Sequence, residues 1–244
     1  MTEPISHARS FGSAAERYDR HRPSYAPEAV VWALGERPLR VVDLGAGTGI
    51  LSRLLHRHGH EVVAVEPDNL MREHLLQTSP GVMAYAGSAE RIPLPDGSVD
   101  AVVAGQAYHW FDPERAHPEI ARVLRPAGVL AAFWNDADLG APWTVRFVEI
   151  IDGGGEAAAQ RPLSDFGPLF GPVEAGEFPH DRWMTPDDLV ALATTRSPYL
   201  VGTDHERAAL LGEIRELLAG RELAGHARFP MPHLTRVHRA TRLA

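Results

Sequence analysis

The sequence of 244 residues contains no cysteine. Disulfide bonds, thiolate zinc sites and cysteine nucleophiles are therefore excluded, because each of them needs a thiol. The absence fits a reducing compartment, and we expect a cytoplasmic protein. A chain of this length can bury a sizeable core without crosslinks, so a single α/β domain is expected.

Long apolar runs and an excess of positive charge are missing as well. No apolar stretch approaches the roughly 18 residues of a membrane-spanning helix, and the opening MTEPISHARSFGSAAERYDRHRP lacks the apolar run of a signal peptide. The chain carries 24 Lys and Arg against 32 Asp and Glu, a formal net charge of −8. An acidic surface repels phosphate backbones, so we expect neither a nucleic-acid partner nor a membrane. A local basic pocket for a small anion stays open.

Strand-like and helix-like segments alternate through the first half of the chain. Apolar and β-branched runs predict strands over residues 39–44, 61–66, 81–85, 100–104 and 128–134. Helical spacing and capping signals predict helices over residues 48–58, 68–77 and 113–124, with Asp68 as the N-cap of the second. This alternation predicts a parallel sheet with helices on both faces and a ligand site beyond the carboxyl ends of its strands.

The second half is less regular. The glycine-rich stretch DGGGEAAAQRP, residues 152–162, is typical of a flexible connection. Later segments predict two helices and two strands, over residues 185–192, 204–218, 173–184 and 233–240. Residues 10–34 precede the first strand, and we expect them to form helices that cover the site.

A glycine-rich loop follows the first expected strand. In VVDLGAGTGI, Gly45, Gly47 and Gly49 lie between a strand and a helix, where glycines let backbone amides approach a ligand closely. The spacing is G-x-G-x-G, and Ile50 stands where the dinucleotide fingerprint G-x-G-x-x-G needs its last glycine. The loop therefore indicates a nucleoside-containing cofactor and counts against a nicotinamide dinucleotide.

Two further positions support a bound nucleoside. Glu66 ends the second strand, about twenty residues beyond the loop, where a carboxylate can accept both hydroxyls of a ribose. The alternative is an ordinary solvated acid at a strand end. After the third strand, the Ala89 amide can meet an adenine ring nitrogen, and Ser88 or Glu90 can accept from its exocyclic amine.

Four segments together resemble a known family. VVDLGAGTGILSRLL, VVAVEPDNLMREHL, GSAERIPLPDGSVDAVVAGQAYHWFD and ARVLRPAGVLAAFWN are similar, in order and spacing, to the signature regions of class I S-adenosylmethionine-dependent methyltransferases. The likeness is greatest to the UbiE-like and trans-aconitate methyltransferase-like enzymes that act on small molecules. The resemblance implies a Rossmann-like, seven-stranded, mostly parallel sheet with an antiparallel last strand and an N-terminal helical lid.

The resemblance also implies a division of the chain and a set of cofactor contacts. Residues 1–244 would form one domain, with lid helices over 1–38, a cofactor-binding core over 39–135, and substrate-side helices and a C-terminal hairpin over 136–244. The cofactor, S-adenosyl-L-methionine, would be bound by Tyr18, Asp43, Gly45, Ala46, Gly47, Gly49, Glu66, Pro67, Met71, Ser88, Ala89, Glu90 and Gln106. Ala127 stands where glycine is usual, and it would be strained if its turn needs a positive φ.

The stretch GQAYHWFD, residues 105–112, follows the fourth strand and is expected to separate methyl donor from acceptor. His109 is the candidate general base, because an imidazole titrates near neutral pH; a structural histidine is the alternative, since a carboxylate acceptor needs no base. Tyr108 and Trp110 would either line the pocket or pack in the hydrophobic core. Packing is expected more for Trp110 than for Tyr108. Arg22 and Tyr25 are candidate substrate contacts, and Arg182 and Arg196 receive no role.

The predicted function is methyl transfer to a small-molecule acceptor, a carboxylate or a hydroxyl. The alternatives are a catalytically silent S-adenosylmethionine-binding module and a nicotinamide-dependent oxidoreductase. Base methylation of nucleic acid is disfavoured, because GQAY stands where an Asn/Asp-Pro-Pro-Tyr/Phe motif is usual. No metal is expected, since the histidines of HRHGH, residues 56–60, do not converge as ligands would. The substrate and the oligomeric state stay open.

Overall fold

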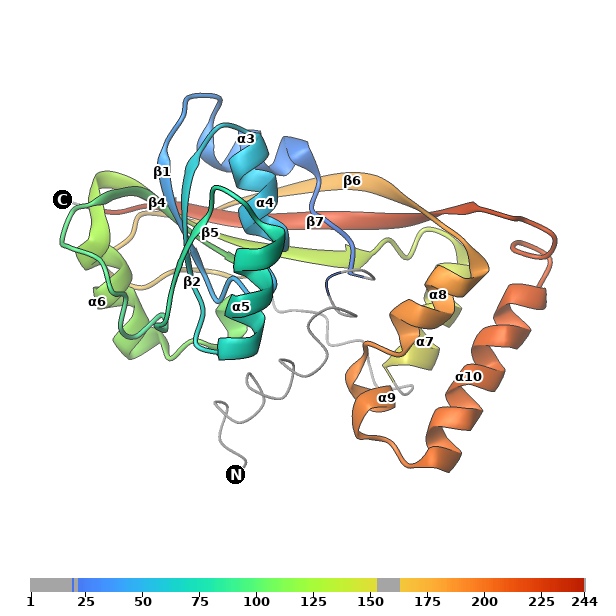
Figure 1. The fold of residues 1–244 in the computed structure, drawn as a ribbon. Coiled ribbons are helices and arrows are strands. Elements are labelled where there is room, and N and C mark those ends of the chain that lie inside the picture. The colour runs from blue at the N-terminus through green and yellow to red at the C-terminus, as the bar shows by residue number, and fades with distance from the viewer. Residues whose placement is uncertain (1–18, 20–21, 153–162, 244) are drawn as a thin grey trace.

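The protein is described by a computed structural model that covers residue 19 and residues 22–152 and 163–243. Its seven-stranded sheet has the order β3-β2-β1-β4-β5-β7-β6 (Figure 1). The strands are β1 Arg40–Leu44, β2 Glu61–Val65, β3 Met83–Tyr85, β4 Val99–Gly105, β5 Leu124–Ala137, β6 Glu174–Met184 and β7 Phe229–Thr241. β1 to β5 pair in parallel, and β7 runs antiparallel to both of its neighbours. The predicted Rossmann-like sheet with an antiparallel last strand is confirmed.

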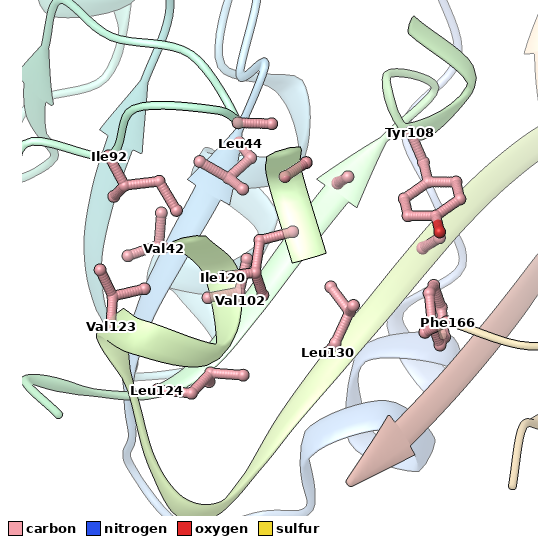
Figure 2. Close-up of a cluster of buried hydrophobic side chains, with 14 of the residues drawn as sticks. Val42, Leu44, Ile92, Val102, Tyr108, Ile120, Val123, Leu124, Leu130 and Phe166 are labelled. Carbon is pink, nitrogen blue, oxygen red and sulfur yellow. The ribbon is translucent and has the colours of Figure 1, made fainter. Parts of the chain in front are cut away.

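Helices cover both faces of the sheet because the central strands are apolar on both sides. On β1, Val41 packs into the core beneath α3, α4 and α5, and its neighbours Val42 and Leu44 belong to the core beneath α6. Figure 2 shows the second of these cores. The helices are α3 Pro27–Leu34, α4 Ile50–Arg57, α5 Asn69–Thr78 and α6 Pro113–Val123.

A third cluster joins the helices of the second half. It buries Phe147, Leu189 and Ile214 together with Met184 and Phe229 from the ends of β6 and β7. Figure 1 shows these helices beyond one end of the long β6–β7 ribbon. They are α7 Pro142–Ile151, α8 Pro186–Ala193, α9 Ser197–Val201 and α10 Asp204–Ala219. α7 was not predicted from the sequence, because its β-branched run is equally typical of a strand.

Local signals set several element boundaries. The Asp68 carboxylate accepts hydrogen bonds from the Leu70 and Met71 amides, so the predicted N-cap of α5 is confirmed. Ala127 has φ 61°, the left-handed conformation in which alanine is strained. In the part of the lid segment that the structure describes, α3 packs against β6 and β7 on one face of the sheet, so it does not itself cover the site.

Candidate active site

The glycine loop leaves β1 in a conformation that needs glycine. Gly45 and Gly47 have φ 64° and 57°, and Gly49, the N-cap of α4, has φ 85°. A Cβ on Gly45 would lie 2.7 Å from the Cβ of Ala107, in the loop that follows β4. The two loops thus approach each other so closely that a side chain on Gly45 would clash with Ala107.

Glu66 lies at the carboxyl end of β2 and faces this loop. Its Oε2 accepts a hydrogen bond from the Gly47 amide over 2.8 Å, and its Oε1 accepts from the Asp68 amide over 2.8 Å. Burial raises the pKa of the carboxyl group, and the two amide donors partly oppose that rise. Each carboxylate oxygen keeps a further lone pair, so the group can still accept from a ligand hydroxyl.

Asp43, on β1 just before the loop, is almost fully buried. Its Oδ2 accepts from the Ser52 hydroxyl over 2.6 Å, and its Oδ1 has no hydrogen-bond partner among the described residues. Burial raises the pKa of Asp43 to about 7. A buried oxygen of this kind is usually satisfied by a ligand or an ordered water. The amides of the glycine loop and the carboxylate of Glu66 fit a nucleoside cofactor. The unpartnered oxygen of Asp43 fits an ammonium group on the same cofactor.

The other predicted cofactor residues lie around the same edge of the sheet. Met71 is buried, with its sulfur 3.8 Å from a Cβ placed on Gly47, whereas Pro67 is exposed. Ala89 is buried, and Ser88 forms an isolated bridge with Arg91. Ala46 is partly exposed between the loop glycines. Tyr18 lies outside the described residues.

Glu90 ties two loops of the site together. Its Oε1 accepts a hydrogen bond from the Asp112 amide over 3.0 Å, at the end of the loop that follows β4. This contact joins the loop after β3 to the loop after β4. The two strands are not neighbours in the sheet, so the strand order alone does not bring their loops together. The carboxylate thus has a structural partner besides any adenine.

Gln106 is the first residue after β4, and its backbone is strained. It has φ 55°, unusual for a residue other than glycine, and its amide donates to the Phe133 carbonyl over 2.8 Å. Its side-chain Nε2 donates to the Asn135 carbonyl over 2.9 Å. The side chain, which sequence reasoning left without a function, therefore fastens the end of β4 to β5.

A small pocket that is open to solvent lies beside this loop. Arg22 and Tyr25, the candidate substrate contacts, both line it together with Gln106, and their contact with a substrate stays a prediction. Tyr25 also packs its hydroxyl end where a Cβ on Gly105 would lie, so glycine is required at the end of β4. The other lining residues are Pro23, Ile50, Asn135, Ala137, Leu192, Arg196, Met231 and His233.

The three aromatic residues after Ala107 do not line this pocket. Tyr108 lies in the core beneath α6, where its hydroxyl meets His117 Nε2 at 2.7 Å and its ring packs against Phe166 at 5.2 Å (Figure 2). Burial, and secondarily the charge of Asp165, raises the pKa of Tyr108 to about 12. Tyr108 thus packs in the core, the alternative that the sequence left open, and its substrate contact stays a prediction.

His109 and Trp110 occupy the outer side of the short 3-10 turn η2 (Tyr108–Trp110). Both are exposed, and their ring centroids are 4.7 Å apart. Partial desolvation lowers the pKa of His109. Because a 3-10 turn sends successive side chains in different directions, Tyr108 points inward and its two neighbours do not. Packing was expected for Trp110 more than for Tyr108, and the structure reverses that order.

Sequence reasoning missed the far wall of the pocket. Asn135 comes from the end of β5, Arg196 from the junction of α8 and α9, and Met231 and His233 from β7. The basic character of Arg196 was visible in the sequence, but no spacing pattern joins residues this far apart. Only the return of β7 alongside β5 brings them to one place.

Comparisons with known proteins agree with this geometry. A methyltransferase domain family matches residues 42–132. An uncharacterized methyltransferase of Mycobacterium tuberculosis is 42% identical over 233 residues, 95% of each chain. A malonyl-[acyl-carrier protein] O-methyltransferase of Methylococcus capsulatus is 38% identical over 133 residues, 50% of this chain and 48% of that protein. A solved structure assigned to the type II methyltransferases, from Anaeromyxobacter dehalogenans, has TM-score 0.66 and 26% identity over 91% of this chain and 97% of that one.

The chain belongs to the class I S-adenosylmethionine-dependent methyltransferases, and S-adenosylmethionine is its cofactor. The UbiE-like and trans-aconitate methyltransferase-like likeness stays a prediction. Among residues 19, 22–152 and 163–243, no helix is long and apolar enough to cross a membrane. Within the same residues, no group of three or more His, Asp or Glu side chains is placed to hold a metal ion.

Proposed function

We propose that this methyltransferase esterifies the carboxylate of a small acidic molecule bound between Arg22 and Arg196. The pocket that contains both arginines carries the proposal, because it opens beside Gln106 and Ile50, at the carboxyl end of β4 and the start of α4. No Asp or Glu occurs among its described lining residues, although the chain as a whole carries a net charge of −8. A cationic pocket on an acidic protein favours a small anion over a nucleic acid.

The cofactor half of the site is proposed from the residues around the glycine loop. Glu66 would accept the ribose hydroxyls, and the amides of Gly45 and Gly47 would lie along the methionine part. Asp43 would face the cofactor's positive end, and Ala89 with Ser88 would read the adenine edge. When bound, the cofactor supplies an activated methyl group on a sulfonium; the protein has to orient the acceptor and exclude water.

A carboxylate acceptor explains why the site needs no strong base. A carboxylate reacts as an anion, so no proton has to be removed during the transfer. His109, the candidate base in the sequence, lies outside the described pocket lining. A relative from Methylococcus capsulatus supports a carboxylate acceptor, because it is named a malonyl-[acyl-carrier protein] O-methyltransferase. Arg22 and Arg196 would hold the acid and turn one carboxylate oxygen toward the methyl donor.

The pocket draws its walls from three parts of the chain. Residues 22–25 come from the predicted lid segment, Gln106 from the cofactor core, and Arg196 with His233 from the second half. Asp19 pairs with Arg53 and lies 3.4 Å from His74, which ties the predicted lid segment, at this residue, to α4 and α5. We also propose that residues 1–244 act as one catalytic domain, and that the protein is cytoplasmic.

Transfer of a labelled methyl group from S-adenosylmethionine to a panel of small carboxylic acids tests the proposal. A methyl ester releases volatile methanol in base, whereas a methyl ether or amine does not, so the product identifies the acceptor atom. We expect Arg196→Gln and Arg22→Gln each to raise KM for the acid at least tenfold and to leave the Kd for S-adenosylhomocysteine unchanged. Arg215→Gln, at an exposed residue of α10, is the matched control. Base-stable products, or equal turnover of acids and their amides, would overturn the proposal.

A further inference from the structure

His233 lines the pocket, and its ring nitrogen Nδ1 has a hydrogen-bond partner on the backbone. We infer that His233 is a specificity residue that selects acids carrying a hydroxyl group beside the carboxylate. The inference rests on the proposed function, because it assumes that an acid binds in this pocket. It adds a second recognition element, a neutral acceptor that faces a donor on the substrate.

The backbone decides which nitrogen of His233 carries the proton. Nδ1 lies 2.9 Å from the Met231 carbonyl oxygen. A carbonyl oxygen only accepts, so Nδ1 must donate and must be protonated. In the neutral ring Nε2 then holds a lone pair, and it is the nitrogen left to meet a molecule in the pocket.

The surroundings of His233 keep the ring neutral. The residue is only 3% exposed, and burial lowers its pKa to about 4, with the charges of His180, Arg182 and Arg196 acting in the same direction against the Met231 hydrogen bond. Protonation would place a further positive charge beside two arginines. His233 therefore accepts hydrogen bonds at neutral pH, and recognition rather than proton removal is its function.

His180 fixes the orientation of the ring. The two imidazoles stack with centroids 5.5 Å apart and an interplanar angle of 23°. His180 Nε2 donates to Asn135 Oδ1 over 2.9 Å, and Thr235 donates to the same oxygen over 3.1 Å. Asn135 Nδ2 in turn donates to the Ser24 carbonyl over 2.8 Å.

These contacts leave the pocket with a distinct polarity. The Asn135 amide is engaged at both of its polar atoms, and Arg22 and Arg196 can only donate. A carboxylate can accept hydrogen bonds from the arginines, and a hydroxyl on the same molecule can donate to His233 Nε2. An acid without the hydroxyl would bury that lone pair without a partner, which lowers its affinity.

Matched pairs of acids test the inference: malate with succinate, 3-hydroxybutyrate with butyrate, and salicylate with benzoate. For at least one pair, we expect the wild-type protein to favour the hydroxy acid about tenfold in kcat/KM. His233→Phe should bring that ratio close to one, mainly by raising KM for the hydroxy acid. His233→Gln, which keeps an acceptor, should retain part of the preference. His238→Gln, on the opposite face of β7, should keep all of it.

Binding separates this inference from the proposed function. The same acids are titrated calorimetrically into wild-type and variant protein saturated with S-adenosylhomocysteine, and the ¹⁵N shift of His233 Nε2 is followed by NMR in the wild-type protein. Hydroxy acids should bind about tenfold more tightly than their partners and should move the Nε2 signal. Equal binding or equal turnover within every pair, or a preference that survives in His233→Phe, would refute the function of His233 and leave carboxylate methylation intact. Failure of every acid both to bind and to react would refute both.

Discussion

The Gly47 amide donates to the Glu66 carboxylate over 2.8 Å, which joins the glycine loop after β1 to the end of β2. Two sequence signals about twenty residues apart thus belong to one hydrogen-bonded unit. The carboxylate shapes the loop, and under the proposed function its remaining lone pairs would accept from a ribose. Any change at Glu66 should therefore affect cofactor affinity through both routes.

Glu66→Gln tests this unit. An amide keeps the shape of the side chain, but its NH₂ must face one of the two backbone donors, Gly47 or Asp68. We expect the Kd for S-adenosylhomocysteine to rise by about ten- to a hundredfold, as measured by calorimetry. Glu61→Gln, at the exposed start of β2, is the control and should leave the Kd unchanged. Unchanged binding in Glu66→Gln would exclude Glu66 from the cofactor site.

Gly45→Ala should separate close packing from backbone strain. The added Cβ would meet Ala107 at 2.7 Å, and φ is 64°. Gly97 has φ 56° but open space around its Cβ position. Both alanine variants should lose about 1–2 kcal/mol of folding free energy through the left-handed backbone, measured by urea unfolding.

Only Gly45→Ala should also lower affinity for S-adenosylhomocysteine, because it displaces the loop after β4. A similar loss of affinity in Gly97→Ala would show that global destabilisation, and not the local contact, is responsible.

Asp43 should make the stability of the protein depend on pH. Burial raises its pKa from 3.8 to about 7. Between those values the folded protein retains a proton that the unfolded chain releases, so the free energy of unfolding falls as pH rises from about 4 to 7. Asp43→Asn removes this dependence while its amide oxygen can still accept from Ser52.

We therefore expect the Tm difference, variant minus wild type, to be more positive at pH 8 than at pH 5, as measured by differential scanning calorimetry without cofactor. A difference that is equal at the two pH values would contradict a raised pKa at Asp43.

Tyr108→Phe should affect stability and spare catalysis. The change removes the hydrogen bond to His117 inside the core beneath α6 and leaves the ring packing against Phe166 in place. We expect a loss of about 1 kcal/mol in unfolding free energy and an unchanged kcat/KM for the methylated acid. A selective fall in kcat/KM at unchanged stability would return Tyr108 to the acceptor site.

The sequence alone determined the parallel core of the sheet and the glycine loop that Glu66 faces. Local patterns suffice there: apolar runs specify β1, β2 and β4, the spacing of Gly45 and Gly47 specifies the loop, and Glu66 follows at a fixed distance along the chain. The N-cap at Asp68 and the strained turn at Ala127 were also predictable, because each depends on a residue and its immediate neighbours.

The pocket that we propose for the acceptor was decided only by the tertiary structure. The η2 turn sets which way Tyr108, His109 and Trp110 point, and a one-residue rotation would exchange a core side chain for an exposed one. Arg22, Arg196 and His233 come together because β7 returns antiparallel to β5 and because residues 24–26, just before α3, hydrogen-bond to Asn135 of β5 and Thr235 of β7. Contacts between residues so distant in the chain depend on packing of whole elements, and no local periodicity encodes them.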